Sequence, residues 1–259
     1  MNMDRPVLDN ISVVLVGTLY SGNIGSAARA IMNMGIKDLR LVNPESVLTE
    51  ECRNMAVNAW PIVENAPVFN TLNQAVAGSS LVVGTTCQRG RRRKMREYTP
   101  REIAPLLVKT SADLKTSLVF GPERGGLTES ELAECQYLVN IPASPELPTL
   151  NLAQAVLITC YELFACLVQP EDDVMPQPDF DLPSQEERAQ MFRHIEKTLV
   201  SIGFLSSSNP SHIMLSLKRL LGGERLSRRD IKIVRGIMSR MDWYVEHGMD
   251  LPPEKIKRP

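Results

Sequence analysis

Residues 117–128 read SLVFGPERGGLT, and this is the most informative stretch of the chain. The short apolar run Ser117–Phe120 predicts a buried strand, which leads directly into Gly121-Pro122 and then Gly125-Gly126. Three glycines in six residues after a strand require an unusual backbone path. We therefore expect more here than a simple turn between a strand and a helix.

A second unusual connection follows in residues 140–163, which read NIPASPELPTLNLAQAVLITCYEL. The end of a strand meets a loop interrupted by prolines, and Leu150-Asn151-Leu152-Ala153 then enters a long apolar helix. Thr149 and Asn151 place a hydroxyl and an amide at the start of that helix. Capping of the helix N-terminus alone explains at least one of the two.

A third glycine-rich turn lies near the N-terminus, in VGTLYSGNIGSAARAIMNMG, residues 16–35. A strand followed by such a turn and a helix points backbone N–H groups at an anion. The spacing matches neither the dinucleotide-binding motif nor the P-loop. Glycines used only for tight packing explain the turn equally well. Asn23 can cap the helix, and Arg29 is either a phosphate clamp or a surface arginine.

The wider pattern alternates short strands that are apolar on both faces with helical segments, which predicts an α/β fold with a mostly parallel sheet. The expected helices cover about 23–35, 71–78, 100–109 and 151–168. The expected strands are Ile11–Val16, Asp38–Val42, Ser80–Gly84, Ser117–Phe120 and Tyr137–Ile141.

The sequence pattern changes after residue 168. Residues 169–183 hold four prolines and five acids without periodicity, which is typical of a linker. Beyond them the pattern is helical, and Ser184 with Glu187 has the spacing of a capping box. We predict one domain over residues 1–168, this linker, and a small all-α domain over residues 184–259. The second domain has 14 basic and 9 acidic residues, which favours a polyanionic partner.

Composition excludes several classes of protein. With 259 residues, 43% hydrophobic and 23% charged, the chain has the composition of a globular protein. It contains no apolar run long enough to span a membrane and no signal-like start, so we expect a cytoplasmic protein. The five cysteines form no CxxC pair and the three histidines no metal-ligand spacing. We therefore expect no disulfide framework and no metal, and mostly buried cysteines.

A dense basic run follows the third predicted strand, where six of the eight residues 89–96 are cationic. It is either a solvated loop or a loop that follows the phosphates of a nucleic acid. The candidate residues for binding nucleic acid are Arg89, Arg91, Arg92, Arg93 and Lys94.

Together the three unusual connections resemble the motifs of the SPOUT superfamily, in its SpoU/TrmH branch of RNA ribose 2′-O-methyltransferases. Residues 23–29 correspond to the first motif, residues 120–127 to the second, and residues 141–142 with 149–156 to the third. The resemblance covers about residues 10–168. Thr149 stands where the third motif usually has serine, which keeps a hydroxyl at that position.

This resemblance implies a C-terminal trefoil knot in the sheet, S-adenosylmethionine bound in the knotted loops, and a homodimer with its active site near the subunit interface. The LNLAQAV form with a helical extension is similar to tRNA methyltransferases that act on nucleotide 32, a cytidine or uridine of the anticodon loop. Another tRNA or rRNA position is the alternative. A non-catalytic RNA-binding protein of this fold is a further one.

The resemblance also assigns the site. Arg29 would hold the RNA phosphate and ribose so that the 2′-hydroxyl is activated, since no histidine lies near the motifs. Asn23, Thr149 and Asn151 would hold the same hydroxyl and its phosphate. No metal is needed. The residues expected against the methyl donor are Thr85, Thr86, Gly121, Glu123, Gly125, Ile141 and Leu150.

Overall fold

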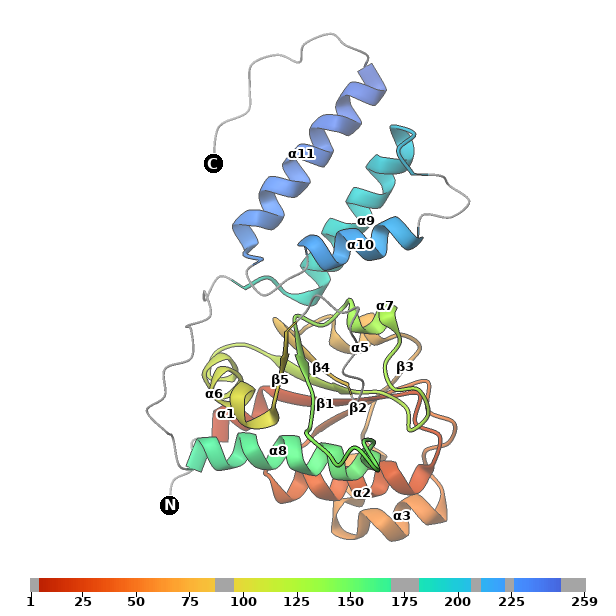
Figure 1. Cartoon of the computed structure of the whole chain (residues 1–259), viewed down its shortest axis with the longest axis vertical. Helices are drawn as coiled ribbons and strands as arrows, with labels where there is room; N and C mark the ends of the chain where they lie inside the picture. The colour runs from red at the N-terminus through yellow and green to blue at the C-terminus, as the bar shows by residue number, and fades with distance from the viewer. Residues whose placement is uncertain (1–4, 87–95, 169–181, 206–210, 222–225, 248–259) are drawn as a thin grey trace.

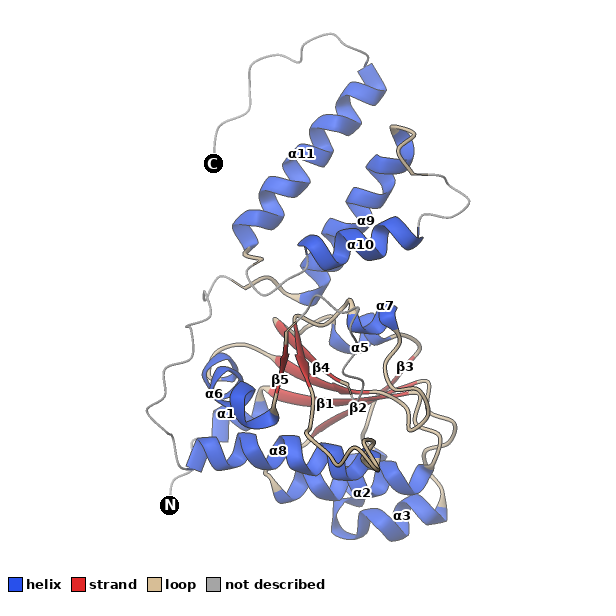
Figure 2. Ribbon diagram, viewed as in Figure 1, coloured by secondary structure: helices blue, strands red, loops and turns tan. Residues whose placement is uncertain are grey.

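The computed structural model describes residues 5–86, 96–168, 182–205, 211–221 and 226–247. The predicted RNA-binding residues Arg89, Arg91, Arg92, Arg93 and Lys94 lie outside these ranges, and so does most of the predicted linker. A seven-stranded sheet has the strand order β3-β2-β1-β6-β4-β7-β5, and it forms the centre of the part of the chain that precedes the C-terminal helices (Figure 2). Every pair of neighbouring strands is parallel, which confirms the predicted α/β class. The trefoil knot stays a prediction.

The five longer strands agree with the predicted ones to within two residues at either end. The two edge strands, β3 and β5, were not predicted because two residues give no periodic pattern. The strands are β1 (Ile11–Val16), β2 (Asp38–Val42), β3 (Val68–Phe69), β4 (Leu81–Thr85), β5 (Glu97–Tyr98), β6 (Thr116–Phe120) and β7 (Tyr137–Val139).

Helices cover both faces of the sheet. The four helices predicted for the first domain are confirmed as α2, α5, α6 and α8, whereas α1, α3, α4 and α7 were not predicted. The helices of this part are α1 (Arg5–Asp9), α2 (Ser21–Asn33), α3 (Glu50–Ala56), α4 (Trp60–Glu64), α5 (Leu72–Val76), α6 (Pro100–Ser111), α7 (Glu129–Leu132) and α8 (Leu152–Val168), with a 3₁₀ turn at Val57–Ala59.

The strands bury side chains on both faces, in two separate cores. In β1, Val13 and Leu15 belong to a core shared with α2, α6 and α8, whereas Val14 and Val16 belong to a second core with α5 and α7. This alternation follows from the two-residue period of a strand. Figure 1 shows the result, with α2, α3 and α8 on one side of the sheet and α5 and α7 on the other.

A third core holds together the tail, by which we mean α9 (Gln185–Ser201), α10 (Ser211–Leu221) and α11 (Arg228–His247). The capping box that begins α9 is confirmed, because Ser184 Oγ accepts from the Glu187 amide at 3.2 Å and Glu187 Oε2 accepts from the Ser184 amide at 2.6 Å. Gln185 N also donates to Ser79 O at 2.7 Å. Ser79 lies just before β4, so the tail joins the sheet at the amino end of that strand (Figure 1).

Three of the cysteines serve as small apolar residues in the cores. Cys52, Cys135 and Cys160 are fully buried, as expected for small apolar residues. Burial raises the pKa of the Cys160 thiol to about 12, so this side chain stays neutral. Across the described ranges, histidine, cysteine and acidic side chains form no cluster able to bind a metal ion. None of the described helices combines the length and apolar character needed to cross a membrane.

Candidate active site

A pocket opens at the carboxyl ends of β4, β6 and β7, where ligands bind in open parallel sheets. The three strands are neighbours, so Thr85, Phe120 and Val139 at their ends come together. The loops that follow β6 and β7 complete the lining. All seven residues expected against the donor line this pocket, together with Thr149: Thr85, Thr86, Gly121, Glu123, Gly125, Ile141 and Leu150.

The loop after β6 turns back on the end of its own strand. A Cβ atom at Gly121 would lie 2.3 Å from the Leu127 amide nitrogen, which no side chain tolerates. Gly125 and Gly126 follow with φ of +87° and +65°. The unusual backbone path expected from the three glycines is therefore confirmed, and it keeps the backbone at the pocket free of side chains.

Glu123 connects this loop to the N-terminus of α2. Its Oε2 accepts from the Leu19 amide at 3.0 Å and its Oε1 from Asn23 Nδ2 at 2.5 Å. Burial raises the pKa of this carboxyl, but these hydrogen bonds outweigh burial and hold the pKa below its ordinary value. The carboxylate is thus ionised at neutral pH. It faces a helix N-terminus, where negative charge is favoured.

A second hydrogen bond extends the chain from Asn23 to the start of α8, since Asn151 Nδ2 donates to Asn23 Oδ1 at 2.9 Å. Asn151 Oδ1 accepts from the Ala153 amide at 2.9 Å, so the expected capping role is confirmed for Asn151. Asn23 does not cap α2, because the helix begins two residues earlier and Tyr20 is its N-cap. Glu123, Asn23 and Asn151 thereby join the three motifs in one hydrogen-bonded chain.

The structure places Arg29 elsewhere. Its side chain is exposed on the second half of α2 and does not line the pocket. Among the described residues it has no hydrogen-bond or ion-pair partner. Gly25, on the same helix, serves packing, because a Cβ there would lie 2.2 Å from Cys52 O in α3. Tight packing thus explains this glycine without a ligand, whereas nothing in the packing explains Arg29.

Asn140 is a site residue that the sequence did not reveal. It is 7% exposed, and its Nδ2 donates to Thr86 O at 2.9 Å while its amide donates to Tyr98 O at 2.8 Å. It therefore fixes one wall of the pocket from the end of β7. A polar residue that ends an apolar strand was the available signal.

Comparison with known proteins agrees with this geometry. The SpoU rRNA Methylase family matches residues 10–161, which contain the sheet and all three motifs. The C-terminal domain of tRNA methyltransferase TrmJ matches residues 186–250, which cover α9 except its first residue and all of α10 and α11.

Individual relatives match over nearly the whole chain. The tRNA (cytidine/uridine-2′-O-)-methyltransferase TrmJ of Salmonella choleraesuis is 38% identical over 91% of this chain and 98% of its own. The tRNA (cytidine/uridine/adenosine-2′-O-)-methyltransferase TrmJ of Pseudomonas aeruginosa is 39% identical over 90% and 94%. The crystal structure of TrmJ from Z. mobilis ZM4 is 31% identical, with a TM-score of 0.77 over 89% of this chain and 98% of that one. With its motifs joined at one pocket, the chain belongs to the SpoU methylase family and is a methyltransferase that uses S-adenosylmethionine.

Proposed function

We propose that this enzyme methylates the ribose 2′-hydroxyl of nucleotide 32, cytidine or uridine, in the anticodon loop of tRNA. One observation carries the proposal: the hydrogen-bonded chain of Glu123, Asn23 and Asn151 joins all three motifs beside a single pocket. The Salmonella and Pseudomonas relatives, named as tRNA 2′-O-methyltransferases, support the substrate class. The LNLAQAV form of the third motif and the presence of the helical tail support nucleotide 32 as the methylated position.

The pocket suits the methyl donor. Ile141 and Leu150 offer apolar surface for an adenine ring, Thr85 and Thr86 offer hydroxyls, and the glycine loop offers backbone groups. When bound there, S-adenosylmethionine supplies a methyl group on a positively charged sulfur. The residues of this chain then have two tasks, to align the ribose hydroxyl and to draw away its proton.

We assign those tasks to different side chains. Asn23 and Asn151 already bond to each other, to Glu123 and to the start of α8, so they hold the two loops in place. Thr149 is exposed at the pocket and makes no hydrogen bond within the described part of the chain, so its hydroxyl is available to orient the ribose. Arg29 holds the phosphate and promotes ionisation of the hydroxyl.

The position of Arg29 supports a homodimer. It lies outside its own pocket, yet the resemblance places the active site near a subunit interface. On α8, in the same layer as α2, Leu157 and Tyr161 are 40% and 53% exposed. We propose that a second copy covers this face and that Arg29 of one subunit serves the pocket of the other.

The tail, in this proposal, binds tRNA beyond the target loop. Residues 1–168 form the methyltransferase domain, residues 169–183 the linker and residues 184–259 the RNA-binding domain of a cytoplasmic enzyme. On α11, the Cζ atom of Arg240 lies 5.7 Å from the ring centroid of Trp243 and 5.2 Å from that of Tyr244. Cations beside partly exposed aromatic rings suit a nucleic acid, whose bases stack and whose phosphates attract charge. The described cations of the tail include Arg228, Arg229, Lys232, Arg235 and Arg240.

Mass spectrometry of tRNA nucleosides tests the proposal, after unmodified tRNA is incubated with enzyme and donor. We expect 2′-O-methylcytidine or 2′-O-methyluridine in the fragment that contains nucleotide 32. Ribose methylation at another tRNA position, or methylation only when rRNA replaces tRNA in the assay, would support the alternative substrate instead. Binding of tRNA without any methylation would support the non-catalytic alternative.

A further inference from the structure

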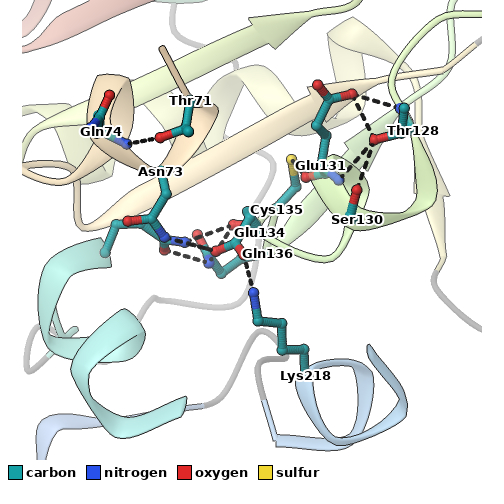
Figure 3. Close-up of polar contacts among 11 residues, drawn as sticks. Thr71, Asn73, Gln74, Thr128, Ser130, Glu131, Glu134, Cys135, Gln136 and Lys218 are labelled. Atoms are coloured by element: carbon teal, nitrogen blue, oxygen red, sulfur yellow. Dashed lines mark hydrogen bonds and ion pairs between the residues drawn. The ribbon is translucent and has the colours of Figure 1, made fainter. Parts of the chain in front are cut away.

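The junction between tail and sheet is centred on Glu134, which lies between α7 and β7. Its carboxylate accepts from Asn73 Nδ2 of α5 at 3.3 Å and from Gln185 Nε2 of α9 at 2.8 Å. It also pairs with Lys218 of α10 (Figure 3). The side chains of Glu134 and Lys218 are only 14% and 28% exposed. One carboxylate thus connects the first domain to two helices of the tail.

Gln136 ties the same junction to the sheet. Its Oε1 accepts from the Val82 amide of β4 at 2.8 Å, and its Nε2 donates to Gln185 Oε1 at 3.3 Å. Gln136 and Gln185 are 3% and 2% exposed, so these amides have little access to water. Because buried amides require partners, the tail has one favoured orientation against the sheet.

The junction and the pocket lie at opposite ends of β4. Gln185 bonds at the amino end of this strand, whereas Thr85 lines the pocket at the carboxyl end. The tail therefore does not line the pocket of its own chain in the described structure. It holds the basic helix α11 at a set position away from the reacting hydroxyl.

We infer that Glu134, Gln185 and Lys218 are positioning residues that make the enzyme selective for an RNA long enough to reach both the pocket and α11. This inference rests on the proposed function, and it identifies the length of the RNA as the feature of the substrate that the tail recognises. A short anticodon stem–loop fills only the pocket. Whole tRNA gains the contacts of α11 only if the junction holds the tail in its orientation.

Removing the charge of Lys218 tests the junction most directly. Lys218→Met leaves the Glu134 carboxylate partly buried without its cation, which favours loss of the junction. We expect KM for whole tRNA to rise about tenfold, as for loss of a partly buried charge pair. KM for an isolated anticodon stem–loop and kcat on both substrates should stay unchanged. Lys218→Arg keeps the charge and should restore most of the affinity.

Arg219→Met is the matched control. Arg219 also pairs across the junction, with Glu129, but the two side chains are 46% and 53% exposed. Such a surface pair contributes little, so this variant should behave as wild type. Equal effects of Lys218→Met and Arg219→Met on tRNA would overturn the inference, because loss of any cation would then suffice.

Glu134→Gln separates orientation from direct charge. If the junction only adds charge near RNA, removing this carboxylate should tighten tRNA binding. If it orients the tail, the same substitution should weaken tRNA binding and flatten its salt dependence, since the phosphate contacts of α11 are lost. Tighter binding, or an equal loss on the stem–loop, would overturn the inference.

Small-angle scattering of these variants gives a result that does not depend on the substrate. Lys218→Met and Glu134→Gln should enlarge the radius of gyration while donor binding, measured by titration calorimetry, stays intact. An unchanged radius of gyration would show that these residues do not hold the tail in place, and it would overturn the inference even if the variants remain active. A larger radius in an enzyme that methylates no tRNA would support the junction and contradict the proposed function instead.

Discussion

The sheet and the tail are built differently. Residues of the central strands, such as Val13 and Leu118, are 0–1% exposed, and polar side chains join loops that are far apart in the sequence. In α11, by contrast, Ile231 is the one buried residue of the described helix, and Ile233 and Ile237 are about half exposed. The sheet can therefore fix atoms for catalysis, whereas the tail offers surface for a large partner.

The contacts inside the tail are also partly polar. Asp242 of α11 bonds to His194 Nε2 at 2.8 Å and accepts from Thr198 Oγ1 at 2.6 Å. Loss of one buried apolar side chain weakens a core in proportion to its area, but such polar contacts depend on pH and geometry. Because the pocket lies in the first domain and the basic helix α11 lies in the tail, we expect substitutions at the pocket mainly to affect kcat and those in the tail mainly to affect tRNA affinity.

Arg29→Ala should have the largest effect. We expect methyl transfer to fall roughly 10²–10³-fold, because a cation that stabilises developing charge is lost. Donor affinity should not change, since Arg29 does not line the pocket. Calorimetry and single-turnover assays measure the two quantities, with Lys37→Ala as an exposed cation beyond the same helix for control. Loss of donor binding would show that Arg29 supports the pocket or the fold.

Co-expression of Arg29→Ala with a donor-site variant, Gly121→Val, sharpens this test. If Arg29 serves the partner's pocket, mixed dimers have one complete site, and about a quarter of the activity should return for random pairing. If Arg29 serves its own pocket, no activity returns.

Removal of the tail should have the next largest effect. A fragment that ends at residue 168 keeps every strand of the described residues and all three motifs, so it should fold, dimerise and bind the donor. Its affinity for tRNA should fall at least about tenfold, because the cations of α11 are lost. Sedimentation and filter binding measure both properties. A fragment fully active on whole tRNA would show that the tail is dispensable.

Neutralising Arg91, Arg92 and Arg93 together asks how much RNA affinity comes from the first domain. If three phosphates are contacted, the log–log slope of tRNA affinity against salt should flatten by roughly 2–3. Binding at several salt concentrations provides the slope. An unchanged slope in a folded variant would identify the run as a solvated loop.

Asp242→Asn should have the smallest effect, confined to the tail. Burial raises the pKa of Asp242, but hydrogen bonds from Thr198 and His194 outweigh it, so the pKa lies below its ordinary value. The ionised form therefore stabilises the fold above about pH 4, and this contribution is lost as the pH falls through the lowered pKa. We expect the variant to lose about 1 kcal/mol at pH 7.

Denaturant unfolding followed by circular dichroism measures this loss of stability. The difference between variant and wild type should shrink toward pH 3. A difference independent of pH would mean that Asp242 acts through packing instead of charge.

The sequence was informative where the physical signal was local. Long apolar runs such as Ile11–Val16 and the spacing of Ser184 with Glu187 gave β1 and the start of α9 correctly. The edge strand β3 was missed because its two residues, Val68 and Phe69, give no periodic pattern, and it has only one strand neighbour. Contacts between distant segments carry no local signal, which is why the roles of Glu123 and Glu134 became visible only in the structure.

The chain of Glu123, Asn23 and Asn151 also affects synthesis of the protein. Asn23 leaves the ribosome early, but its partners follow 100 and 128 residues later. Since synthesis proceeds at about 5–20 residues per second, the first motif waits several seconds for the groups that fix it. No nascent chain that lacks α8 contains a closed active site. Methylation therefore begins only when nearly the whole first domain has emerged and folded.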